Sequence, residues 1–356
     1  MTHPPTEIQA AEVLLQCTDL IANLTFFTKE MGFDIDSIFP ADDPSIAQIS
    51  GYGLRLRLER SHTNVPTEIR LLTRATPGPP CSAPNGTVLS FHAHHTPLHM
   101  PPLQPGFVLT RLQDNWVTGR AGMQYRDLIP DRQGGCFIAS HIRIPNDGPV
   151  PDYVHYHKVL FQMIYCLAGE VEVVYEDQGP AFVLRPGDCV LQPPQIRHRV
   201  LNASNGLEVL EIGCPADHET HTDRKLTLPN NEINPKRDFE GSRFLRYHMD
   251  DSPWQPWWVN AFVCRELGYT AATQGLATVN HVRSTGPIPA QDCTHYNKLT
   301  FIYVLKGMLQ LTTKDGETHN MSKGDSAVLA PGESHQIAVV EPMEMLEVRI
   351  KDKNSL

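Results

Sequence analysis

The sequence predicts a mainly β protein that contains two tandem antiparallel barrels and a smaller N-terminal β/α module. Three observations carry this prediction. Short runs rich in Val, Ile, Leu, Tyr and Phe are separated by Gly, Pro or Asp turns at intervals of roughly 8 to 12 residues; the middle of the chain is repeated near its end; and residues 10–60 contain one helical stretch among strands. With 356 residues, the chain has room for two or three domains.

The N-terminal module has its own pattern. A strand-like VLLQC is followed by ANLTFFTKEMGF, in which Leu24, Phe27 and Met31 share one helical face, and then by the strand-like IDSIF, IAQIS and LRLRLER. The predicted order is therefore βαβββ. A single sheet of this kind leaves an edge or a face that needs cover, so we expect the module to pack against the barrels or against another subunit, in a homodimer or a higher homo-oligomer.

An internal repeat sets the remaining organisation. His155-Tyr156-His157-Lys158 corresponds to His295-Tyr296-Asn297-Lys298, and the same order of matches continues through Gly169 and Gly307 to Glu211 and Glu347. The offset between the copies drifts by only a few residues, as small turn deletions in a duplicated domain would produce. The predicted segments are the N-terminal module (1–75), an irregular Pro- and Gly-rich connection (76–119), the first barrel (120–214), a polar linker and lead-in arm (215–256) and the second barrel (257–356).

Charge and hydropathy exclude some partners. The net charge is −10, and no run of five or more Lys and Arg is present to neutralise phosphates, so nucleic acid and anionic membranes are not expected partners. No apolar run approaches the roughly 18 residues of a membrane span, and the first residues do not resemble a signal peptide. We therefore expect a cytoplasmic protein.

Three histidines form the strongest functional pattern. His155 and His157 are two residues apart on a predicted strand, so their imidazoles project to the same face. Gln162 and Gly169 follow, and His198 comes shortly after a Pro-Gly-Asp turn. The arrangement HxH(x)4Q(x)6G followed by PGD, PP and H resembles the two motifs of the cupin superfamily, whose jelly-roll barrels are double-stranded β-helices that hold a divalent metal. Because the repeat carries the likeness into the second copy, the chain resembles a bicupin.

The resemblance implies a metal site in the first barrel. His155, His157 and His198 would be ligands, and Gln162 stands where most cupins place Glu. A carboxamide oxygen can coordinate a metal, but it lacks the negative charge of a carboxylate and cannot act as a base. Three imidazoles and an oxygen suit one divalent transition metal; Fe(II) is favoured, and Mn(II), Ni(II), Cu(II) and Zn(II) remain open.

Flanking residues and the second copy complete the expected site. Tyr153, Arg197 and Arg199 flank the ligands, and we expect them to bind the substrate. In the second copy Asn297 replaces a ligand histidine and Thr300 replaces the glutamine, which predicts a barrel without metal. Glu211, and the pair His141 and Arg143, have counterparts in both copies, so we expect them to serve the fold.

The resemblance implies a function class but leaves the reaction open. A cupin metal centre of this kind favours a metal-dependent oxidoreductase, a dioxygenase that uses O2 on a small enol, phenol or diketone. One alternative is a hydrolase, isomerase or lyase in which the metal acts as a Lewis acid. Another is a non-catalytic bicupin that binds a small molecule.

The N-terminal module resembles half of a glyoxalase/vicinal-oxygen-chelate domain.

Overall fold

The computed structural model of the protein describes residues 7–94, 98–113, 116–119, 122–249 and 251–352. Its N-terminal unit is a β/α module of two sheets. This compact unit ends at Pro97. Its four-stranded sheet has the order β1-β4-β3-β2, with β1 parallel to β4, and so confirms the βαβββ prediction. Its elements are β1 (Val13–Cys17), α1 (Leu20–Thr25), the π-helical turn η1 (Phe26–Glu30), β2 (Asp34–Phe39), β3 (Ile46–Gly51) and β4 (Leu54–Arg60).

The helix of this unit covers one face of the sheet. Asp19 caps it by accepting a hydrogen bond of 2.9 Å from the backbone N–H of Ala22. Buried apolar side chains of the helical segment, including Phe27, pack against those of the central strands, including Leu56 and Leu58. A second sheet contains β5 (Glu68–Thr73), β6 (Cys81–Ser82) and β7 (Val88–Ala93) in the order β5-β7-β6.

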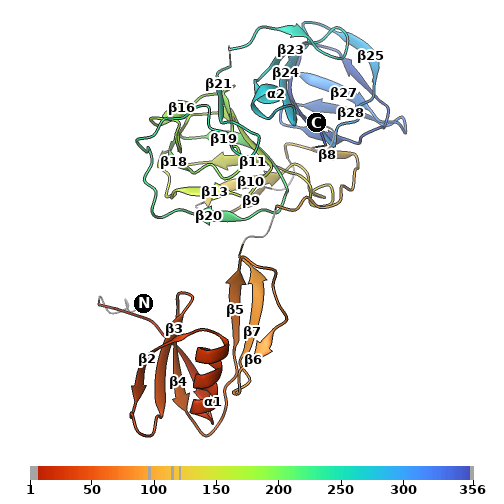
Figure 1. Ribbon diagram of the computed structural model, residues 1–356. Helices are drawn as coiled ribbons and strands as arrows, with labels where there is room; N and C mark the ends of the chain where they lie inside the picture. Colours follow the sequence, from red (N-terminus) through yellow and green to blue (C-terminus); the bar gives the residue numbers. More distant parts are fainter. Residues whose placement is uncertain (1–6, 95–97, 114–115, 120–121, 250, 353–356) are drawn as a thin grey trace. The chain divides into compact units, whose positions relative to one another are not determined.

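The first barrel is built from two facing antiparallel sheets (Figure 1). The seven-stranded sheet has the order β21-β17-β14-β19-β11-β10-β9, and the other has the order β16-β15-β18-β13-β20, with β12 also paired to β18. The strands are β9 (Trp116–Thr118), β10 (Gln124–Asp127), β11 (Ile138–Ile144), β12 (Gly148–Pro149), β13 (His155–His157), β14 (Phe161–Ala168), β15 (Val171–Tyr175), β16 (Phe182–Leu184), β17 (Cys189–Leu191), β18 (His198–Ala203), β19 (Leu207–Cys214), β20 (Thr220–Thr222) and β21 (Leu245–Tyr247).

The second barrel repeats this plan. Its larger sheet has the order β22-β23-β24-β31-β26-β29-β8, and its smaller sheet has the order β25-β30-β27-β28. Its elements are β8 (Val108–Thr110), β22 (Gln255–Pro256), β23 (Val263–Glu266), α2 (Tyr269–Ala272), β24 (Ala277–Arg283), β25 (Ile288–Cys293), β26 (Leu299–Lys306), β27 (Met308–Thr312), β28 (Thr318–Ser322), β29 (Ser326–Leu329), β30 (His335–Val339) and β31 (Glu344–Ile350). The prediction of a mainly β chain with two barrels is confirmed.

The two barrels exchange their lead-in strands. β8 precedes the first barrel in the chain but pairs with β29 of the second barrel, and Figure 1 shows it beside the blue strands. In return, β21 precedes the second barrel but pairs with β17 of the first. The segment 76–119 is therefore not the irregular connection that its Pro and Gly content predicted, because it contains β6 to β9. Their backbone groups are paired in three different sheets, and no local pattern reveals such distant pairing.

The long strand β14 is buried on both faces: one face packs against the second barrel, and the other lines the interior of the first. On β14, Phe161, Met163 and Tyr165 belong to a core that both barrels share, whereas Gln162 and Ile164 face the interior of the first barrel. Burial on both faces explains the nearly continuous apolar run FQMIYCLA.

A buried arginine connects the two barrels. Arg126 is fully buried; its Nη1 donates to the carbonyl of Arg111 and its Nη2 to that of Gly324, both at 2.6 Å. Beside it, His141 Nε2 lies 2.8 Å from Glu208, which also accepts a hydrogen bond from Arg143. These contacts agree with the structural role predicted for His141 and Arg143.

Among the described residues, no helix is long and apolar enough to cross a membrane.

Candidate metal centre

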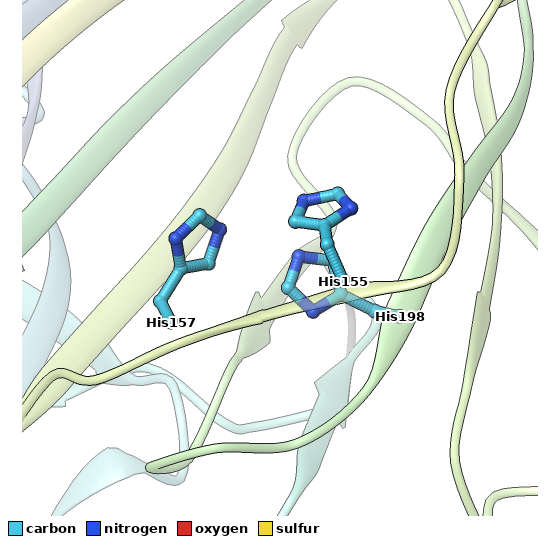
Figure 2. Close-up of side chains that lie close together, drawn as sticks. All are labelled: His155, His157 and His198. Carbon is cyan, nitrogen blue, oxygen red and sulfur yellow. The ribbon is translucent and has the colours of Figure 1, made fainter. Parts of the chain in front are cut away.

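Two neighbouring strands bring the three histidines together. His155 and His157 lie on β13, and His198 begins β18, where it is paired directly with His155 in the sheet register. The side chains converge in Figure 2, and one ring nitrogen from each lies within 4.8 Å of the others. His155 and His198 are buried, and His157 is half-buried. Strand alternation places His155 and His157 on one face of the sheet, and the register places His198 opposite His155 on that same face.

The other ring nitrogen of each histidine is already engaged. His155 Nδ1 lies 2.8 Å from the carbonyl of Tyr153, and His198 Nδ1 lies 3.0 Å from that of Ile196. Because a carbonyl can only accept, both Nδ1 atoms donate a proton, which leaves Nε2 as the atom that can face a metal. His157 Nδ1 lies 2.8 Å from the hydroxyl of Thr220. Hydrogen bonds of this kind orient the imidazoles of metal sites.

Burial keeps the deepest histidine neutral. It lowers the pKa of His198 to about 3, and the neighbouring His155 acts in the same direction. A ring that resists protonation at neutral pH can offer its lone pair to a cation. The buried triad could therefore hold a metal ion.

A fourth donor lies in the same cavity. Gln162 is almost fully buried, its Nε2 donates to Glu211, and its Oε1 is buried with no hydrogen-bond partner among the described residues. A buried oxygen without a hydrogen-bond partner raises the free energy of the folded state unless a positively charged or hydrogen-bond-donating group approaches it. Three imidazoles and a neutral oxygen form a donor set that suits a divalent first-row transition metal.

The triad opens onto a cavity of about 440 Å³ between the two sheets. Most of its wall is apolar and comes from strands on both sides, including Ile164 on β14, Val173 on β15 and Val209 on β19. Polar groups other than the triad include Asp152, Tyr153, Gln162, Tyr175, Gln192, Glu211 and Thr220. The cavity thus combines a polar donor cluster with space for an apolar ligand body.

A family model described as a cupin domain matches residues 141–213 and again residues 286–349. Both barrels are cupin domains. No curated protein matches the chain in sequence. The matched regions lie in the two barrels described above, so the first cupin domain contains the histidine triad and the second contains its altered copy.

Solved structures support the same fold. The chain is similar to salicylate 1,2-dioxygenase from Pseudaminobacter salicylatoxidans at 13% sequence identity and a TM-score of 0.55, over 70% of this chain and 86% of that one. A variant of Bacillus subtilis oxalate decarboxylase is similar at 14% identity and a TM-score of 0.50, over 73% of this chain and 80% of that one. At this level of identity the likeness concerns the fold alone.

The structure does not bring all of the predicted substrate residues into the cavity of the first cupin domain. Tyr153 contributes to the wall, but Arg197 and Arg199 do not. They come directly before and after His198, the first residue of β18, and so face the opposite side of the sheet. The guanidinium of Arg197 lies 4.2 Å from the ring centre of Tyr156 and forms an ion pair with Asp223. The prediction that these two arginines bind the substrate is therefore corrected.

Two acidic residues of the cavity were not predicted as site residues. Asp152 accepts a hydrogen bond from the backbone of Val200 and lies 3.5 Å from His155 Nδ1. Glu211 was assigned to the fold, yet it lines the cavity and contacts Gln162. Glu211 pairs with Ile164, which lies two residues after Gln162, so both side chains share the face of Gln162. This pairing joins strands that are far apart in sequence, and no local pattern reveals it.

The second cupin domain has a different interior. His295 and His335 remain, with ring centres 6.1 Å apart, while Asn297 donates a hydrogen bond to Thr300. Side chains at several wall positions are larger than in the first domain and pack into one core; the pairs are Val171 and Leu309, Val173 and Leu311, and Val209 and Met345.

Proposed function

We propose that the chain is a metal-dependent dioxygenase whose first cupin domain holds one divalent transition metal, with Fe(II) favoured. The proposed ligands are His155, His157, His198 and Gln162. The observation that supports this most is the convergence of three oriented imidazoles at the wall of an apolar cavity. When bound, an Fe(II) ion would supply the electronic route by which O2 reacts with an organic molecule.

The cavity favours a small substrate with an apolar body and an oxygen donor. Polar groups gather around the triad, and the sheet faces beyond them contribute branched aliphatic side chains. Tyr153 lies at the histidine end, with its ring centre 5.9 Å from that of His155. An enol, a phenol or a diketone would direct its oxygens toward the histidines and bury its carbon skeleton against Ile164 and Val173.

Oxygen consumption tests the proposal. The protein is stripped of metal and reloaded separately with Fe(II), Mn(II), Ni(II), Cu(II) or Zn(II), and O2 uptake is recorded with a panel of small enols, catechols and diketones. We expect uptake with a redox-active metal and at least one member of the panel, and none with Zn(II). Metal binding without uptake would favour the alternative of a hydrolase, isomerase or lyase that uses the ion as a Lewis acid.

The N-terminal unit is proposed to act in assembly, and its resemblance to half of a glyoxalase domain stays a prediction. β2 is an edge strand of the four-stranded sheet, and Ile35, Ile38 and Phe39 on it are exposed. A chain that begins at Leu98, the first residue of the second compact unit, should therefore form smaller oligomers and keep its metal. Light scattering and elemental analysis would measure both properties. Loss of metal with an unchanged oligomeric state would contradict this role.

A further inference from the structure

A carboxylate on the neighbouring strand holds the carboxamide of Gln162. Gln162 on β14 is 1% exposed, and its Nε2 donates a hydrogen bond of 2.5 Å to Oε1 of Glu211 on β19. Because a carboxylate offers only acceptors, this contact requires that the NH2 group of the amide faces Glu211. The amide oxygen is therefore held at the other end of the group. It lies buried and unpaired among the described residues, in the wall that Gln162 shares with the three histidines.

The second cupin domain shows what the same glutamate does when no such amide is present. Glu347 is the counterpart of Glu211, and Thr300 is the counterpart of Gln162; the two glutamates occupy the same register position, opposite Ile302 and Ile164. Glu347 is fully buried and accepts hydrogen bonds from the indole N–H groups of Trp257 and Trp258 and from Asn280, at 2.8 to 3.0 Å.

The two domains therefore use one strand position differently. In the second domain, the glutamate fastens the lead-in segment that carries the two tryptophans. In the first domain, the glutamate lies at the cavity, and the amide of Gln162 is its one side-chain hydrogen-bond partner among the described residues. The contact in the first domain thus does not fasten a lead-in segment, and its effect falls on the orientation of Gln162.

We propose that Glu211 is a positioning residue of the metal centre, because it holds Gln162 with its oxygen as the fourth protein donor and its NH2 group away from the ion. This inference rests on the proposed function, since it requires a metal on the triad. An amide can exchange its oxygen and nitrogen by a half-turn about its last torsion. In the exchanged orientation the N–H dipoles would oppose a cation, so a fixed orientation raises metal affinity.

A set of three variants tests the inference with Co(II) as the probe. Glu211→Gln keeps the size of the side chain but can pair with either end of the Gln162 amide, so the orientation is no longer enforced. Gln162→Glu places two carboxylates against each other. The double variant Gln162→Glu/Glu211→Gln exchanges the two groups and restores a hydrogen bond between an amide and a carboxylate. Glu208→Gln is the matched control, because Glu208 lies on the same strand but pairs with His141.

Co(II) affinity, measured by competition with a chelator, and the visible absorption of the bound ion are the two readouts. We expect Glu211→Gln to weaken binding by roughly tenfold or more and to change the Co(II) spectrum, with the control unchanged. The double variant should bind more tightly than Glu211→Gln, which also shows that the substitution at position 211 does not prevent folding.

The outcomes separate this inference from the proposed function. If the unaltered protein binds Co(II) and Glu211→Gln changes neither affinity nor spectrum, Glu211 does not position the ligand although the metal centre stands. Independent effects of the two substitutions would equally overturn the inference. If the unaltered protein binds no divalent metal, the proposed function and this inference both fail.

Discussion

Replacing His157 with alanine is expected to empty the first cupin domain of metal. One ring nitrogen from each triad histidine lies within 4.8 Å of the others, and removal of one leaves two imidazoles and an amide to compete with water. Changes that merely disturb such ligands cost about 10- to 100-fold in affinity, so loss of a ligand should cost at least about 100-fold. After dialysis against a mild chelator, elemental analysis should find about one metal per unaltered chain and almost none in the variant.

Two histidine substitutions provide controls for this experiment. His221 lies on β20 beside the triad strand, is half-buried and stacks on Tyr156, so His221→Ala should keep its metal. His295→Ala in the second cupin domain should keep it as well, because that domain is expected to bind none. Full metal occupancy in His157→Ala would mean that β13 does not supply ligands. Two metals per unaltered chain would contradict the expectation for the second domain.

Replacing Arg126 with alanine is expected to be the most destabilising change between the barrels. The side chain is fully buried, and its two terminal nitrogens donate to carbonyls of Arg111 and Gly324. Hydrogen bonds from a charged donor contribute about 1.5 to 3 kcal/mol each, and their loss leaves buried carbonyls unpaired, so we expect a loss of at least about 3 kcal/mol. Thermal and denaturant unfolding would measure it.

Arg265 supplies the matched control, because it occupies the same repeat position in the second domain. It donates to the carbonyl of Met249 at 2.9 Å in an exposed setting and lies over the ring of Trp254. Arg265→Ala should therefore lower stability by only about 1 kcal/mol. Equal effects of the two substitutions would mean that burial of Arg126 between the barrels does not determine its contribution.

The sequence predicted the features that depend on short stretches of chain. Strand alternation and turn spacing are local, so the two barrels, the βαβββ order and the shared face of His155 and His157 follow from residues close together. The same alternation also indicates that, when His198 faces inward, Arg197 and Arg199 must face outward. In contrast, the position of Glu211 on the face of Gln162 follows from the pairing of β19 with β14, which are far apart in sequence.

Features that depend on distant pairing could not be predicted in this way. β8 and β21 have only three residues each and pair with strands far away in sequence. Three residues are too few to show a periodicity that would identify the partner strand. Arg126 is similar, because a charged residue in a short strand gives no sign that it will be buried between two domains and bonded to Gly324.

The reciprocal pairing of β8 and β21 means that the two cupin domains cannot be separated by one cut. A fragment that ends after the first barrel carries β8, which belongs to its neighbour's sheet, and leaves β17 without an edge partner. The complementary fragment has the same deficiency at β29. This is the connectivity of a domain-swapped dimer of a single barrel, with its two subunits joined in one polypeptide. Two fragments divided between the barrels should therefore be poorly soluble alone and should reassociate when expressed together.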